Sequence, residues 1–169
     1  KSKAECDLCI MKPETCHYHL GTCREDEFAH SVCFQPHIVY LANSSALKIG
    51  ITRIVNMPTR WLDQGATQAL PILKVGSRRL SGHLETLIGT QIADKTDWRK
   101  LLKGEAEPLN LIEQRDQILE EFAPKIQTIR DEFSQNFEFN ENLEFLENEL
   151  PREFIYPVKQ YPEKIKSLN

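Results

Sequence analysis

The chain has 169 residues, a formal net charge of −4 and 40% hydrophobic residues, which suits one ordinary domain with appendages. It contains no apolar run near the roughly 20 residues that a membrane helix needs, and its first residues lack the apolar stretch of a secretory signal. These features exclude a membrane-spanning protein as an interpretation of the sequence, and they predict a cytoplasmic one.

Charge is distributed unevenly along the chain. Residues 37–104 carry 10 basic and 4 acidic side chains, whereas residues 105–169 carry 7 basic and 15 acidic ones. A basic core is expected to meet a polyanion, while the acidic tail faces solvent. We expect four parts: a Cys-rich segment (1–36), the core (37–104), an acidic helical extension (105–150), and the start of a further strand or domain (151–169). Because the chain begins without Met, we also expect it to be part of a longer protein.

The cysteines are concentrated at the N-terminal end. All five lie within the first 33 residues, and they are Cys6, Cys9, Cys16, Cys23 and Cys33. Metal binding explains such a cluster better than disulfides do in a chain without a secretory signal. The segment is polar and too short to bury a core of its own, so a structural Zn²⁺ is expected to stabilise it.

The ligand set of this zinc site stays open at the level of sequence. Cys6 and Cys9 have the spacing of one half of a tetrahedral zinc site. The candidates for the other half are Cys16, His19, Cys23 and Cys33, with His17, His30 and His37 as weaker options, and Cys23 and Cys33 complete either the same ion or a second one. A redox pair fits less well, since the pattern of a strand before the pair and a helix after it is missing. Catalytic zinc also fits less well, because many thiolates favour a closed coordination sphere.

The core predicts an α+β fold, a small antiparallel sheet flanked by helices. Residues 38–42 and 47–52 are typical of two strands of a hairpin. A short helix opens at Pro58 and ends near Gly65, and a third strand covers residues 69–75. Ser77 is expected to cap the next helix, and Thr96 to begin another turn or two.

The acidic extension predicts mostly helix. Residues 109–122 and 125–137 show the amphipathic period of 3.6, and Pro124 between them is expected to break or kink the helix. Residues 140–150 also favour a helix, and residues 154–158 favour a strand.

Two motifs on the predicted hairpin carry a resemblance to a known family. Ile38-Val39-Tyr40 stands where the first motif of the GIY-YIG nucleases stands, and Lys48-Ile49-Gly50 stands where the second does. Arg60 on the following helix and Glu85 on a later helix match the Arg and Glu of that family in the same order of elements. Residues 37–103 therefore resemble the GIY-YIG core. The whole chain also looks like a bacterial family of unknown function that joins a Cys-rich segment to such a core.

The resemblance implies metal-dependent cleavage of phosphodiesters. Glu85 would hold one Mg²⁺ or Mn²⁺, which tolerates a single protein carboxylate together with waters and phosphate oxygens. Arg60 would face the developing negative charge on the phosphate. Tyr40 would position or deprotonate the attacking water. Lys48 departs from the second Tyr of many GIY-YIG enzymes, and it serves either as a base of lowered pKa or as a phosphate contact.

Further positions are expected to bind nucleic acid near the same groove. Gly50 would let the backbone approach a phosphate closely, and Arg53, Gln64 and His83 would line the groove. Each of these residues also fits an ordinary structural role when taken alone.

The sequence thus leads to one functional hypothesis and two alternatives. The first is a zinc-stabilised, GIY-YIG-like endonuclease that acts on nucleic acid, with DNA expected rather than RNA. The alternatives are a non-catalytic, zinc-dependent module that binds nucleic acid and a protein-interaction adaptor that uses the acidic helices.

Overall fold

An antiparallel sheet lies at the centre of the structure. The computed structural model describes residues 2–44, 46–95, 108–136 and 142–157. The strands among these residues are β1 (His37–Asn43), β2 (Leu47–Arg53), β3 (Gln68–Val75), β4 (Leu143–Phe145) and β5 (Arg152–Glu153). Their order is β2-β1-β3-β4, β5 also pairs with β3, and every pair is antiparallel. The expected α+β class with a small antiparallel sheet is confirmed.

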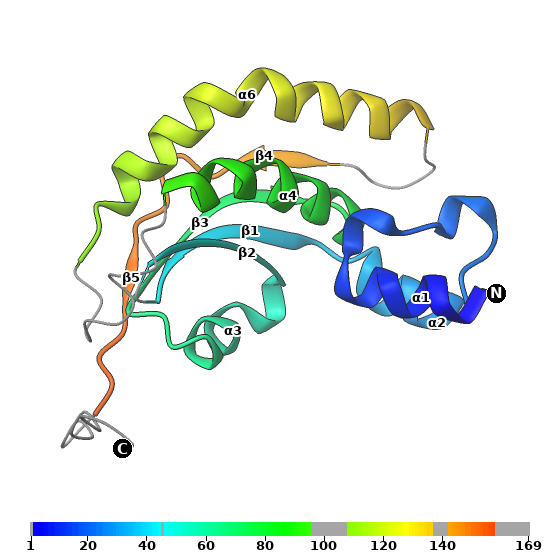
Figure 1. Cartoon of the computed structure of the whole chain (residues 1–169), viewed down its shortest axis with the longest axis horizontal. Helices are drawn as coiled ribbons and strands as arrows, with labels where there is room; N and C mark the ends of the chain where they lie inside the picture. Colours follow the sequence, from blue (N-terminus) through cyan, green and yellow to red (C-terminus); the bar gives the residue numbers. More distant parts are fainter. Residues whose placement is uncertain (1, 45, 96–107, 137–141, 158–169) are drawn as a thin grey trace, which may run out of the picture.

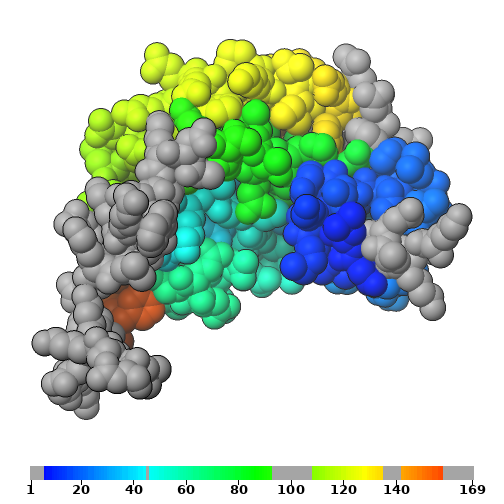
Figure 2. Space-filling model, in the orientation of Figure 1, coloured from blue at the N-terminus to red at the C-terminus, as the bar shows by residue number. Residues whose placement is uncertain are grey.

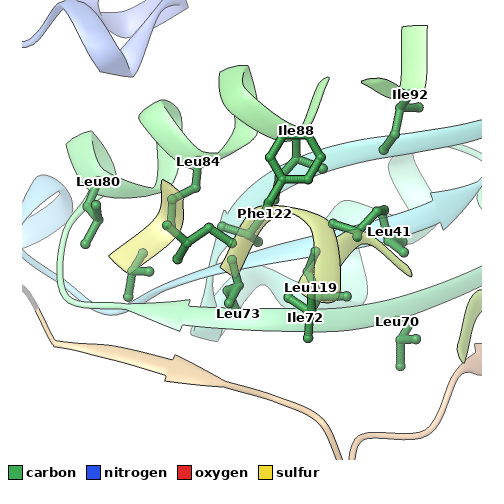
Figure 3. Packing of buried hydrophobic residues seen from close by; sticks show 14 of the residues in the cluster. Leu41, Leu70, Ile72, Leu73, Leu80, Leu84, Ile88, Ile92, Leu119 and Phe122 are labelled. Atoms are coloured by element: carbon green, nitrogen blue, oxygen red, sulfur yellow. The ribbon is translucent and has the colours of Figure 1, made fainter. Parts of the chain in front are cut away.

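Two long helices cover one face of the sheet, namely α4 (Arg78–Lys95) and α6 (Leu111–Asn136) (Figure 1). The main core lies between them and the strands, where side chains such as Leu84, Ile88 and Phe122 are buried (Figure 3). The Ser77 hydroxyl accepts a hydrogen bond of 3.1 Å from the backbone N–H of Leu80, so Ser77 caps α4 as expected.

A shorter helix, α3 (Met57–Asp63), covers the other face after a 3₁₀ turn, η4 (Ile54–Asn56) (Figure 1). It buries Trp61, whose ring lies 5.8 Å from the ring of Tyr40 on β1. Gly65 has a φ of 64° just after the helix, and this left-handed conformation ends α3 where the sequence predicts. The α3 face of the sheet therefore has a small aromatic core of its own.

The Cys-rich segment folds as a chain of short helices (Figure 1) and packs against α4 (Figure 2). They are α1 (Ser2–Met11), η1 (Pro13–Thr15), η2 (Tyr18–Leu20), α2 (Asp26–Phe28) and η3 (Ala29–Cys33), the last of which is a π-helix. The Arg78 guanidinium donates hydrogen bonds of 2.9 Å and 2.5 Å to the carbonyls of Cys9 and Ile10. Arg78 thereby satisfies carbonyls that the end of α1 leaves free and ties the segment to the core.

The C-terminal part differs from the sequence predictions. The helix predicted for residues 140–150 is wrong, because the chain there pairs with the edge of β3 and forms β4. Leu143 and Phe145 pack on the core while Glu144 stays exposed, which is the period of a strand. The helix α6 continues across Pro124, so of the predicted break or kink the break is wrong and the kink stays a prediction. The strand predicted for residues 154–158 is wrong for residues 154–157, because the chain pairs with β3 just before them, as β5, while residue 158 and the turns predicted after Thr96 lie outside the described residues.

A search of the described helices for a membrane span found none of sufficient length and apolar character.

We expect Gly82→Ala to destabilise the protein although Gly82 lies within α4. A Cβ at position 82 would lie 2.7 Å from Cβ of Pro13 and 2.8 Å from the backbone nitrogen of Glu14, so η1 would have to move. Overpacking of this kind typically costs about 1–3 kcal/mol. Gly89→Ala in the same helix is the matched control, because its Cβ would meet Cγ2 of Ile49 at 3.6 Å, an ordinary contact.

Urea unfolding measures both effects. We expect Gly89→Ala to raise the free energy of unfolding by about 0.5–1 kcal/mol, the usual gain for Ala in a helix. Equal gains for both variants would show that η1 does not pack closely on α4.

Candidate functional site

A cleft of about 660 Å³ separates the Cys-rich segment from the core. Its lining comes from both parts, and we call this space the cleft. The Cys-rich segment contributes Ile10, Met11, Pro13 and Val32, and the core contributes His37, Lys48, Ile49, Gly50, Ile51, Thr52, Arg53, Asn56, Arg60, Gln64, Arg78 and Glu85. Six of the eight residues predicted for catalysis or nucleic-acid binding thus line a single space: Lys48, Gly50, Arg53, Arg60, Gln64 and Glu85.

The cleft is cationic on the side of the core. Lys48 and Arg53 come from β2, Arg60 from α3, and Arg78 from the first turn of α4. His37 adds no charge at neutral pH, because burial lowers its pKa to about 4. Converging cations next to a partly enclosed surface raise the local concentration of anions. The site therefore has the electrostatics of a phosphate-binding surface.

Glu85 is the carboxylate among the described residues that line the cleft. Its pKa is raised, chiefly by burial and then by the neighbouring carboxylate of Glu14, while Arg60 and Arg78 act in the opposite direction. A nearby cation stabilises the ionised form of a partly buried carboxylate that has a second carboxylate close to it. Its chemistry fits a divalent ion held by one protein ligand, waters and phosphate oxygens.

Tyr40 lies behind the cleft, with a side chain that is 0% exposed. Its hydroxyl accepts a hydrogen bond of 2.7 Å from Nε2 of Gln64, and burial raises its pKa above the usual value. Tyr40 pairs with Gly50 across the hairpin, and a Cβ at position 50 would lie 2.7 Å from the tyrosine hydroxyl. Gly50 is therefore required to make room for Tyr40, which is a different reason from the close approach to phosphate that the sequence suggests.

His83 lies away from the cleft. Its ring meets Phe133 of α6 edge to face at 5.0 Å between centroids, and burial lowers its pKa. Along α4, residues 83 and 85 are two positions apart and thus face different sides of the helix. The structure does not bring His83 together with the other predicted binding residues.

The cysteine cavity is a second, smaller space of about 90 Å³ inside the Cys-rich segment, and all five cysteines line it. The backbone N–H of Arg24 donates to Sγ of Cys6 at 3.2 Å, and Nε2 of His17 lies 3.7 Å from the same sulfur. His19 is not part of the lining, because its Nδ1 lies 3.0 Å from Nη1 of Arg79.

The five cysteines line this cavity without forming a metal-binding cluster. In the part of the chain that the structure describes, no group of three His, Cys, Asp or Glu side chains is arranged to hold a metal ion. Rotation about χ1 moves a cysteine sulfur while the backbone stays fixed, so a shared cavity and an unformed cluster are compatible. The shared cavity is the observation that bears on zinc.

Sequence reasoning missed the residues that the Cys-rich segment brings to the cleft. Ile10 and Met11 line it from that segment, the charge of Glu14 raises the pKa of Glu85, and Arg78 of α4, which holds the segment, lines the cleft as well. Their positions depend on how residues 1–36 pack on α4, and no local pattern in the sequence encodes that packing. The basic side chain of Arg78 is the one feature of the sequence that could have indicated a further residue of the cleft.

These features define an α+β protein whose antiparallel sheet carries a cationic cleft next to a cavity lined by cysteines. The chain belongs to a family described as a protein of unknown function, DUF2797, whose model matches residues 1–169. No curated protein and no solved structure matches the chain at a significant level. The resemblance to GIY-YIG nucleases rests on its motifs and stays a prediction.

We expect Glu85→Gln to stabilise the fold at pH 7. The pKa of Glu85 is raised on folding, so ionisation weakens the folded state as pH rises through the carboxyl range. The gain should therefore be largest at neutral pH and shrink towards pH 4. Glu120→Gln, which removes an exposed carboxylate of α6, controls for the loss of one charge.

Thermal unfolding between pH 4 and pH 8 tests this expectation. If Glu85→Gln melts at or below the melting temperature of the parent at pH 7, ionised Glu85 does not destabilise the folded state and the expectation is wrong.

Proposed function

We propose that the protein is a metal-dependent phosphodiesterase that acts on nucleic acid, with DNA as the expected substrate. The observation that supports this function is the convergence of Lys48, Arg60 and Glu85 in one cleft, from β2, α3 and α4. The same residues carry the GIY-YIG resemblance. Cations that bind phosphate, together with a carboxylate suited to a divalent ion, are the parts that metal-assisted phosphodiester hydrolysis needs.

The side chains divide into two roles in this proposal. Arg60 and Arg53 bind phosphate oxygens and offset the charge that develops when a water oxygen attacks phosphorus and the leaving oxygen takes the electrons of the broken bond. Glu85 would hold Mg²⁺ or Mn²⁺, which would polarise the phosphate and lower the pKa of bound water.

Tyr40 acts as a positioning residue rather than a group that touches substrate. It is buried, and its hydroxyl reaches the cleft through Gln64, whose amide it orients. Lys48 is exposed on β2 and binds phosphate as a point charge. The attacking water releases its proton to solvent, which reaches the reacting phosphate through the open cleft.

We expect Glu85→Gln to abolish cleavage, by at least about 100-fold, because it removes the ligand of the divalent ion. Binding of nucleic acid should change by less than about threefold, since the cationic side chains remain. Thr86→Ala, an exposed neighbour on α4, is the matched control. Cleavage of labelled single-stranded, duplex and branched DNA and RNA with Mg²⁺ or Mn²⁺ provides the measurement. Equal cutting by parent and Glu85→Gln would reject the enzyme assignment.

A non-catalytic module that binds nucleic acid is the second candidate. The burial of Tyr40 and the Lys in place of a second Tyr favour it, because neither leaves an evident general base in the cleft. Salt-sensitive binding without metal-dependent cutting would support this candidate. Salt-insensitive, weak contact with DNA and RNA would instead support the protein-interaction adaptor.

We also propose that the cysteine cavity binds one structural Zn²⁺ through four of its five thiolates. All five cysteines line one cavity, and the N–H bond to Cys6 is of the kind that supports a metal thiolate. Free thiols throughout fit a reducing, cytoplasmic compartment. Zinc would supply the cohesion that a short polar segment lacks.

Zinc content tests this site directly. We expect about one Zn²⁺ per purified chain, and Cys9→Ser together with Cys33→Ser to lose it, because the double change leaves three of the five thiols that line the cavity. His19→Ser should keep the metal, since its ring faces Arg79. Zinc-free parent protein with an intact fold would count against the proposal.

A further inference from the structure

The two walls of the cleft differ in chemistry. The core wall carries cations such as Lys48, Arg53 and Arg60, whereas the wall from the Cys-rich segment is apolar, with Ile10, Met11, Pro13 and Val32. A ligand that makes favourable contacts with both walls must therefore have an anionic side and an apolar side.

The apolar wall is exposed to an unusual degree. The Met11 side chain is 80% exposed and the Ile10 side chain is 49% exposed, although both stand beside a cleft. Single exposed apolar residues are common on proteins, but adjacent ones that line a cleft indicate contact with a ligand. Methionine also adapts its shape to flat, polarisable partners.

The position of this wall is fixed by the packing behind it. Arg78 binds the carbonyls of Cys9 and Ile10, directly before Met11. On the other side of Met11, Pro13 rests on α4 at Gly82, where no room for a Cβ remains. The apolar wall is therefore held opposite the cations before any ligand arrives, which lowers the entropic cost of binding.

We propose that the cleft binds an unpaired nucleotide, with its phosphates on the cationic wall and its base against Ile10 and Met11. This inference rests on the proposed function and names its substrate class: single-stranded or locally unpaired nucleic acid. Apolar side chains contact bases that leave the stack, and base contacts of this kind tolerate any sequence. Paired bases inside a duplex hide their faces, so a regular duplex would leave the apolar wall without a partner.

The size of the cleft agrees with this occupant. A volume of about 660 Å³ lies in the range of pockets that enclose a small molecule, which suits a nucleotide rather than a whole duplex. A peptide with acidic and apolar side chains has similar chemistry. Absence of salt-sensitive binding to nucleic acid would favour such a peptide over a nucleotide.

Equilibrium binding by the full chain tests the proposal without relying on catalysis. The probes are a labelled single-stranded DNA, its duplex, and the same duplex with a short unpaired stretch, measured by fluorescence anisotropy without added Mg²⁺ or Mn²⁺. Three variants are compared with the parent. Met11→Ser removes the apolar contact, and Leu8→Ser changes an exposed residue of α1 that does not line the cleft. Arg53→Gln removes a phosphate contact.

We expect the probes with unpaired bases to bind about tenfold more tightly than the duplex. Met11→Ser should weaken binding of these probes about fivefold to tenfold, in line with the loss of one base contact, and should change duplex binding less than twofold. Arg53→Gln should weaken binding of all probes, and Leu8→Ser none.

Two results would overturn the inference while the proposed function survives: duplex binding as tight as single-strand binding, or equal effects of Met11→Ser and Leu8→Ser. Absence of salt-sensitive binding to every probe would overturn both and leave a protein ligand as the occupant.

Discussion

The hydrogen bonds from Arg78 to the end of α1 are the interaction on which the arrangement of the site depends. One guanidinium joins the last turn of a helix that has little core of its own to the first turn of a helix that is packed on the sheet. The same side chain lines the cleft, and its charge acts on Cys9, Cys33, His37 and Glu85. The cysteine cavity, the apolar wall and the carboxylate thus share one neighbour.

The second constraint is steric and lies on the hairpin. Tyr40 and Gly50 occupy opposite positions in the register of β1 and β2, and the tyrosine ring fills the space where any side chain at position 50 would stand. The buried hydroxyl then holds Gln64 at the edge of the cleft. Two residues that the sequence suggests for a catalytic site thus also form a packing unit of the hairpin.

Much of the core could be predicted from the sequence, because its signals are local. The three strands of the core, the Ser77 cap and the end of α3 at Gly65 follow from periodicity and turn chemistry. The cleft could be predicted in part. The order of the motifs along the chain matches that of the GIY-YIG core, and from this match we expect Lys48, Arg60 and Glu85 to lie close together.

The remaining features depend on long-range packing that no local pattern contains. The segment around Leu143 reads as helix in isolation, but the open edge of β3 supplies backbone partners and makes it a strand. Pro124 reads as a break, yet burial of flanking residues such as Phe122 and Ile126 keeps α6 continuous. His83 was misplaced because helical spacing does not reveal which neighbour covers each face, and here Phe133 covers it.

The two walls of the cleft belong to parts of the protein that are stabilised in different ways, and oxidation would therefore affect them differently. The cationic wall stands on a buried hydrophobic core, whereas the apolar wall stands on the Cys-rich segment, in which all five cysteines line one cavity. Oxidants attack the second kind of support and leave the first intact. On the proposed mode of binding, a chain damaged in this way would keep its hydrophobic core and its cationic wall, while the apolar wall would lose part of its support. Oxidative stress would then erode selectivity before it eroded stability.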